Sequence, residues 1–160
     1  MTRKFSTIIL AILLMITTGG CQKKKKTDSE RFAEEYGIST NAVSYMEEDD
    51  VVYQISHGTH AVLITDSSDI DKIKSLCLAA EGHSGMMIFY ISSRDVSTDT
   101  ADAVIEELNP YYPIEKLAIP AIFFVKDGAV VEAVMGEGQA DYSALFDSIA
   151  ASHNPGCNDC

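Results

Sequence analysis

Two short segments of the sequence carry residue types at a spacing that could do chemistry. Cys157-Asn158-Asp159-Cys160 holds two thiols separated by two residues, which is the spacing of a redox dithiol. Asp66-Ser67-Ser68-Asp69 places two carboxylates and two hydroxyls between a short apolar run and a helical pattern. A dithiol could exchange with disulfides. A carboxylate pair could do acid–base work or hold a cation if burial or closeness separates the two pKa values.

The cysteine pair stands at the extreme C-terminus, after Asn154-Pro155-Gly156 has ended regular structure, so we expect residues 153–160 to form a flexible tail. Asp159, the terminal carboxylate and the acidic domain disfavour thiolates, which favours a local disulfide or two exposed thiols over a redox role. His153 adds a third soft ligand, one short of a closed zinc site. We therefore expect no metal or other cofactor, and the pair is only the alternative catalytic site.

The segment from Asp66 to Asp69 has a simpler interpretation as the start of a helix. Ser and Asp side chains accept hydrogen bonds from the free amides of a first helical turn, and acidic residues there complement the helix dipole. On the helix that follows, Cys77 shares one face with the apolar residues Ile70, Ile73 and Ala80. That face is the buried one, so Cys77 is predicted to be a small core residue rather than a nucleophile.

The first 20 residues have the features of a secretory signal segment. A basic start precedes the apolar run Ile8–Ile16, which is too short to span a hydrocarbon core of about 30 Å. Small residues then lead to Cys21, and this order resembles the lipobox of bacterial lipoproteins. The resemblance implies that residues 1–20 are removed and that Cys21 is lipidated. Cleavage nearby without lipidation and an uncleaved anchor are the other interpretations.

Charge is divided unevenly along the chain. Residues 21–28 hold Cys21 and a basic linker, Lys23–Lys26, which can strengthen an acyl anchor on an anionic membrane or act only as a solvated spacer. From Asp28 onward all 24 acidic residues remain but only six of the 12 basic ones, for a net charge of −18. Such an acidic domain argues against nucleic acid, whose phosphates need a basic surface. We expect a protein anchored by lipid to the extracytoplasmic side of the cell membrane.

Hydrophobic periodicity after the linker alternates between strand and helix patterns. Strands are expected at Ala42–Met46, His60–Thr65 and Met86–Ile91, and as a hairpin about Asp127-Gly128 at Ile122–Val125 and Val130–Val134. Helices are expected at Glu30–Tyr36, Ile70–Ala80, Ser97–Asn109 and Ala140–Ala151; Ser29 is the expected cap of the first and Gly82 ends the second. The apolar spacing of Glu48–Ile55 fits a helix and a strand equally well. This order indicates an α/β fold with a mixed central sheet and helices on both faces.

Ile119-Pro120 stands directly before the hairpin, and with this order of elements the chain resembles thioredoxin from Ala42 to about Ala151. The resemblance implies a three-layer fold over residues 42–152 and a cis peptide bond before Pro120. It also implies a Cys-x-x-Cys after the strand that ends at Thr65, where this chain has Asp-Ser-Ser-Asp. The lysine-rich linker and the helical extension, residues 29–41, are similar to small thioredoxin-like lipoproteins of bacteria.

Carboxylates and hydroxyls cannot attack a disulfide, so the active site of the resembled family is expected to be degenerate here, and the chain is not expected to be an enzyme. In that family the backbone beside the cis-proline pairs with an extended peptide, a mode that needs no thiol. We predict that the chain binds a peptide or protein at an edge made by Ile119, Pro120, Asp66, Ser67, Ser68 and Asp69. The alternatives are a thiol–disulfide oxidoreductase that uses Cys157 and Cys160, and an accessory subunit of a secretion, immunity or bacteriocin-export system.

Overall fold

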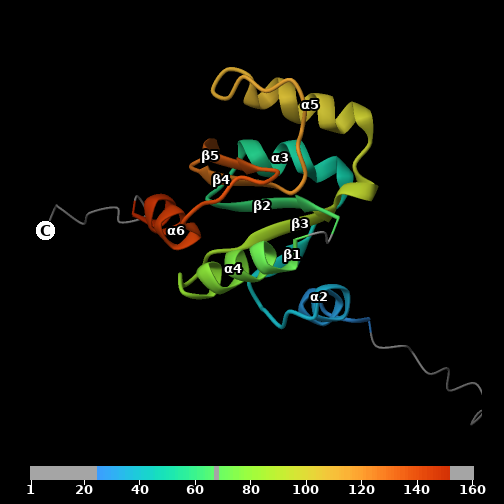
Figure 1. Cartoon of the computed structure of the whole chain (residues 1–160), viewed down its shortest axis with the longest axis vertical. Helices are drawn as coiled ribbons and strands as arrows, with labels where there is room; N and C mark the ends of the chain where they lie inside the picture. The colour runs from blue at the N-terminus through green and yellow to red at the C-terminus, as the bar shows by residue number, and fades with distance from the viewer. Residues whose placement is uncertain (1–24, 67–68, 152–160) are drawn as a thin grey trace, which may run out of the picture.

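A five-stranded mixed sheet lies between two layers of helices in the computed structural model, which describes residues 25–66 and 69–151 (Figure 1). The strands are β1 (Val43–Tyr45), β2 (His60–Thr65), β3 (Ile88–Ser92), β4 (Ala121–Lys126) and β5 (Ala129–Met135), in the spatial order β1-β3-β2-β4-β5. β1, β3 and β2 are mutually parallel, while β4 is antiparallel to β2 and β5 is antiparallel to β4. The expected mixed α/β sheet is confirmed.

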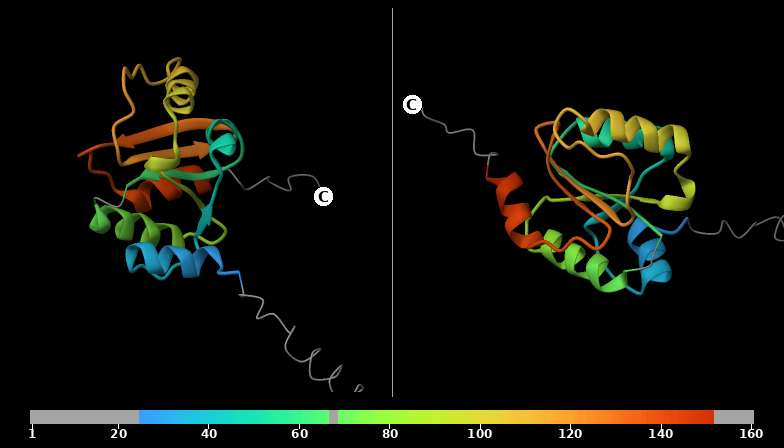
Figure 2. Two further views of the ribbon diagram at one scale, coloured as in Figure 1. Left: turned by 90° about the vertical axis from the view of Figure 1, so that its right-hand side faces the viewer. Right: turned by 45° about the horizontal axis from the view of Figure 1, so that its top comes forward.

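The helices divide between the two faces of the sheet (Figure 2). One face is covered by α2 (Asp28–Tyr36), α4 (Ile70–Glu81) and α6 (Tyr142–Ala150), and the other by α3 (Val51–Ser56) and α5 (Thr98–Leu108). The period of two along a strand explains the division, because Ala61 and Leu63 join the first core and Val62 and Ile64 join the second. The result is a three-layer α/β architecture, which is compatible with a thioredoxin-like fold.

The N-terminal helix α2 belongs to the same core as the sheet. Phe32 and Tyr36 lie four residues apart on its buried face, and their rings contact the ring of Tyr90 on β3 at centroid distances of 5.4 and 5.7 Å. Residues 29–41 and the domain 42–152 therefore share one hydrophobic cluster. The helix begins earlier than expected: Thr27, not Ser29, is its cap, in a capping box with Glu30.

The segment whose period was ambiguous, Glu48–Ile55, is helical. A short 3₁₀ turn at Glu48–Asp50 leads into α3, and Val51 and Ile55 are buried on one face because they lie one helical turn apart. On α4 the prediction for Ile70 was wrong. This residue is 50% exposed because it opens the first turn, whereas Ile73, Cys77 and Ala80 are buried as expected.

The closing hairpin turns at Asp127 and Gly128, which both have positive φ, 52° and 81°. Two successive residues with positive φ are typical of the tight turn that matches strand twist, so the Asp-Gly signal is confirmed. Among the helices of residues 25–66 and 69–151, none is long and apolar enough to cross a membrane.

Candidate functional site

The sheet brings Ile119, Pro120 and Asp66, three of the predicted binding residues, to a single edge. The carboxyl ends of the parallel strands β1, β3 and β2 share that edge, and β2 leaves it at Thr65. β4 begins at the same edge, because Ala121 pairs with Ile64 in the antiparallel register. Pro120 therefore lies beside the end of β2, next to Asp66. The peptide bond between Ile119 and Pro120 is cis, as the resemblance implied.

Pro120 makes a backbone hydrogen bond, whereas the residue before it makes none. Pro120 is buried, and its carbonyl accepts a hydrogen bond from the amide of Gly136 at 2.9 Å. Ile119 is half-buried, and within the described ranges neither its amide nor its carbonyl makes a hydrogen bond. Ile119 thus offers one donor and one acceptor in the loop before β4, and these are the groups that an added strand needs.

Each of the two outer strands, β1 and β5, has a backbone group that a side chain engages. On β1, the outward amide of Tyr45 donates to a carboxylate oxygen of Asp28 on α2 at 3.1 Å, and the Ser44 hydroxyl donates to the same oxygen. On β5, the carbonyl of Val131 accepts from the hydroxyl of Tyr112. The Tyr45 amide and the Val131 carbonyl are therefore already engaged, whereas the backbone of Ile119 makes no hydrogen bond within the described ranges.

The turn after β2 acts as a helix start, as predicted. Asp69 is the N-cap of α4, and its Oδ1 accepts from the amide of Lys72 at 3.0 Å. Asp66 is exposed at the end of β2. Ser67 and Ser68 lie outside the described residues. The carboxylate of Asp69 is committed to the cap, so this turn supports the structural interpretation rather than a paired acid–base site.

Cys77 is a core residue. Only 2% of it is exposed, and burial followed by the nearby charge of Glu81 raises the pKa of its thiol to about 12. It cannot supply a thiolate at neutral pH. The other predicted cysteine sites, Cys21, Cys157 and Cys160, lie outside the described residues. In the part of the chain that is described, no three His, Cys, Asp or Glu side chains are grouped to hold a metal ion.

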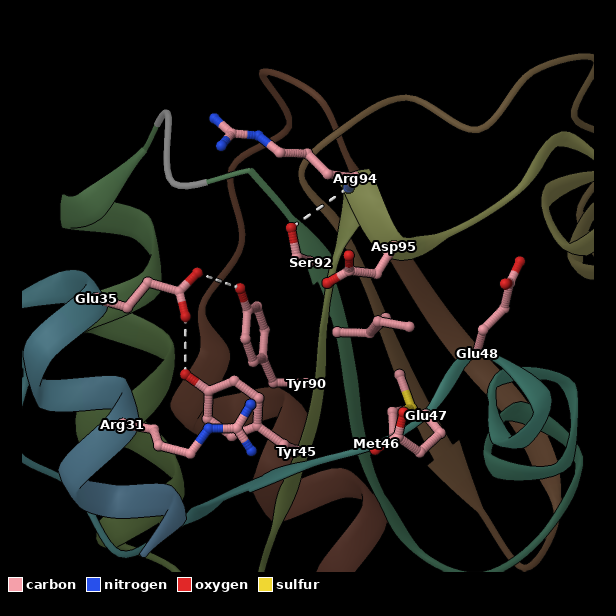
Figure 3. A pocket seen from close by; sticks show the side chains of 11 residues that line it. Arg31, Glu35, Tyr45, Met46, Glu47, Glu48, Tyr90, Ser92, Arg94 and Asp95 are labelled. Atoms are coloured by element: carbon pink, nitrogen blue, oxygen red, sulfur yellow. Dashed lines mark hydrogen bonds between the residues drawn. The ribbon is translucent and has the colours of Figure 1, made fainter. Parts of the chain in front are cut away.

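A cluster of three tyrosines and one glutamate lies beside the edge and was not predicted. Glu35 accepts from Tyr90 at 2.7 Å and from Tyr45 at 2.8 Å, as Figure 3 shows. The hydroxyls of Tyr36 and Tyr90 are 2.7 Å apart. Because the Tyr90 hydroxyl donates its single proton to Glu35, the Tyr36 hydroxyl must be the donor to Tyr90. Burial raises the pKa of all three hydroxyls, that of Tyr36 to about 12.

Glu35, Tyr45 and Tyr90 of this cluster border a cavity of about 600 Å³ at the carboxyl ends of β1 and β3. Figure 3 shows it between α2 and the turn that follows β3, with charged groups of both signs on its wall: Arg31, Glu35, Glu47, Glu48, Arg94 and Asp95. The guanidinium of Arg31 stacks on the Tyr45 ring, 3.8 Å from its centroid. Glu48 is engaged at the start of α5, where it accepts from the Ser97 amide and the Thr100 hydroxyl.

No protein-family model matches the sequence, and no curated protein matches it either.

Proposed function

We propose that the mature chain is an extracytoplasmic, membrane-anchored lipoprotein with a thioredoxin-like domain that binds an extended segment of a peptide or protein without doing dithiol chemistry. The segment pairs with the backbone at Ile119, beside Pro120, and passes over the turn between Asp66 and Asp69. Its anchor is a lipid on Cys21, helped by Lys23–Lys26.

The observation that carries the proposal is the unpaired backbone of Ile119. An extended segment satisfies a free amide and a free carbonyl in one step, and the affinity of strand addition comes from such main-chain bonds. The neighbouring edges at Tyr45 and Val131 already have side-chain partners. Binding at Ile119 replaces no hydrogen bond of the described residues.

The chemistry of the turn supports binding rather than catalysis. The turn contains Asp and Ser where a dithiol would lie, and Cys77 on the helix behind it is buried with a raised pKa. The charge of the domain supports a partner other than nucleic acid, and it favours basic segments through long-range attraction.

The test is capture of an unfolded polypeptide that has no free thiol. Reduced, carboxamidomethylated ribonuclease A is a suitable probe because it is extended and basic. We expect Pro120→Ala to weaken capture at least tenfold, equivalent to about 1.4 kcal/mol of binding free energy. Pro113→Ala is the matched control, since Pro113 is exposed in the same loop, and it should leave capture unchanged.

Equal capture by wild type and Pro120→Ala would contradict the proposal, as would no capture by wild type. Insulin reduction that disappears in Cys157→Ser would support the oxidoreductase instead. The mass of the membrane-extracted protein tests the anchor, which requires an acyl group on Cys21.

A further inference from the structure

Lys72 has a role at the edge that its sequence position did not suggest. It lies in the first turn of α4, and only 10% of its side chain is exposed. Its ammonium donates to the carbonyl of Gly136 at 2.6 Å and is 3.5 Å from Oδ2 of Asp69. A mostly buried ammonium is costly unless its protons are used, so these two contacts fix the side chain in place.

The contact with Gly136 leads directly to Pro120. The amide of Gly136 donates to the Pro120 carbonyl at 2.9 Å, while its carbonyl accepts from Lys72. Gly136 has a positive φ of 57°, which an L side chain adopts only with strain, and a Cβ there would contact Ala118 in the loop. Lys72, Gly136 and Pro120 thus form a continuous hydrogen-bonded connection between α4 and the loop that carries Ile119.

We infer that Lys72 is a positioning residue for peptide binding, which rests on the function proposed above. It holds the first turn of α4 and the Ile119–Pro120 loop at a fixed separation, and this fixes the position of the Ile119 backbone with which the segment pairs. The side chain is suited to the task because a long flexible stem carries several donors, so one residue reaches Asp69 and Gly136 together.

The experiment compares Lys72→Met with Lys74→Met, using the ribonuclease probe. Lys74 is exposed on the same helix, and its replacement changes the net charge equally. Both changes make the domain more acidic, so a purely electrostatic effect would strengthen capture of the basic probe in both variants. We expect Lys72→Met to weaken capture at least fivefold and Lys74→Met to maintain or strengthen it.

Lys72→Gln, which retains a donor on a shorter stem, is measured in parallel in case the methionine variant does not fold, and Lys72→Arg tests rescue. We expect weaker capture by the glutamine variant and substantial recovery by the arginine variant. Hydrogen exchange should accelerate around Pro120 and Gly136 in the impaired variant, with β2 and β3 unchanged.

Unchanged capture by folded Lys72→Met or Lys72→Gln, with wild type active, would overturn the inference while leaving the proposed function intact. Weakened capture with faster exchange throughout the sheet would also overturn it, because that result indicates general destabilisation. No capture by wild type would remove the proposed function, and the inference with it.

Discussion

Tyr90→Phe should destabilise the fold, whereas Tyr142→Phe should not, although each change removes a single buried oxygen. Tyr90 is fully buried, and its hydroxyl donates to Glu35 and accepts from Tyr36. Tyr142 is 6% exposed, and among the described residues its hydroxyl has no hydrogen-bond partner. The two substitutions therefore remove different numbers of hydrogen bonds, while the apolar surface that they bury is the same.

The magnitude follows from the two bonds. A hydrogen bond between neutral groups contributes about 1 kcal/mol, and one to a charged group about 1.5–3 kcal/mol. Glu35 is exposed, so water compensates for part of its loss, but the buried Tyr36 hydroxyl loses the acceptor that lies 2.7 Å from it. We expect Tyr90→Phe to lower the free energy of unfolding by about 2 kcal/mol. Tyr142→Phe should change it by less than about 0.5 kcal/mol or raise it, because an unsatisfied buried hydroxyl is itself unfavourable.

Equilibrium unfolding in guanidinium measures both variants, since the midpoint and slope give the free energy of unfolding. Unchanged slopes would show that the denatured states are comparable. Equal stability of Tyr90→Phe and Tyr142→Phe would refute the reasoning, because the tyrosine–glutamate cluster would then contribute nothing to the fold.

Three further results are expected. His83 lies between two acceptors, the Ala79 carbonyl and the Asp147 carboxylate, which raise its pKa, so only the imidazolium can donate to both. The contribution of His83 to the stability of the fold should be full below the ordinary pKa of about 6.5 and should be lost as pH rises through the raised pKa of the folded state. The difference in thermal midpoint between wild type and His83→Gln should therefore become smaller from pH 5.5 to pH 8.5. A constant difference would contradict this. Cys77 should resist alkylation in the folded protein and react on unfolding, as read by mass mapping of its peptide; labelling under native conditions would show that it is accessible. Gly128→Ala should lower the free energy of unfolding by more than about 1 kcal/mol, because φ is 81° and the new Cβ would lie 2.8 Å from a backbone oxygen; an unchanged guanidinium midpoint would argue against strain at this turn.

Much of the sheet could be predicted from local pattern. The strand His60–Thr65 was predicted with its observed bounds, because an apolar run rich in β-branched residues suits a strand buried on both faces. The hairpin followed from Asp127-Gly128, since few residue pairs tolerate two positive φ values.

Errors arose where local pattern permits two answers. Thr27 and Ser29 are both suitable N-caps, and the capping box that Thr27 forms with Glu30 marks the start of α2. Ile70 fits the apolar spacing of α4, but it is the first residue of the helix and remains half exposed.

The site was predictable only in part. The cis bond before Pro120 came from the resemblance, and the helix-start role of Asp69 came from residue type. The tyrosine–glutamate cluster depends on the parallel register that sets Tyr45 beside Tyr90, and on the placement of α2 over both. The contact between Lys72 and Gly136 joins residues 64 positions apart, which no local spacing indicates.

Amide hydrogen exchange at Ile119, with and without the ribonuclease probe, tests the central claim most directly. The Ile119 amide is unpaired in the free protein, so we expect it to exchange rapidly alone and to become protected when an added strand accepts from it. Amides along β5 should change little. Protection along β1 or β5 with none at Ile119, under conditions where the probe is bound, would place the partner elsewhere and contradict the account.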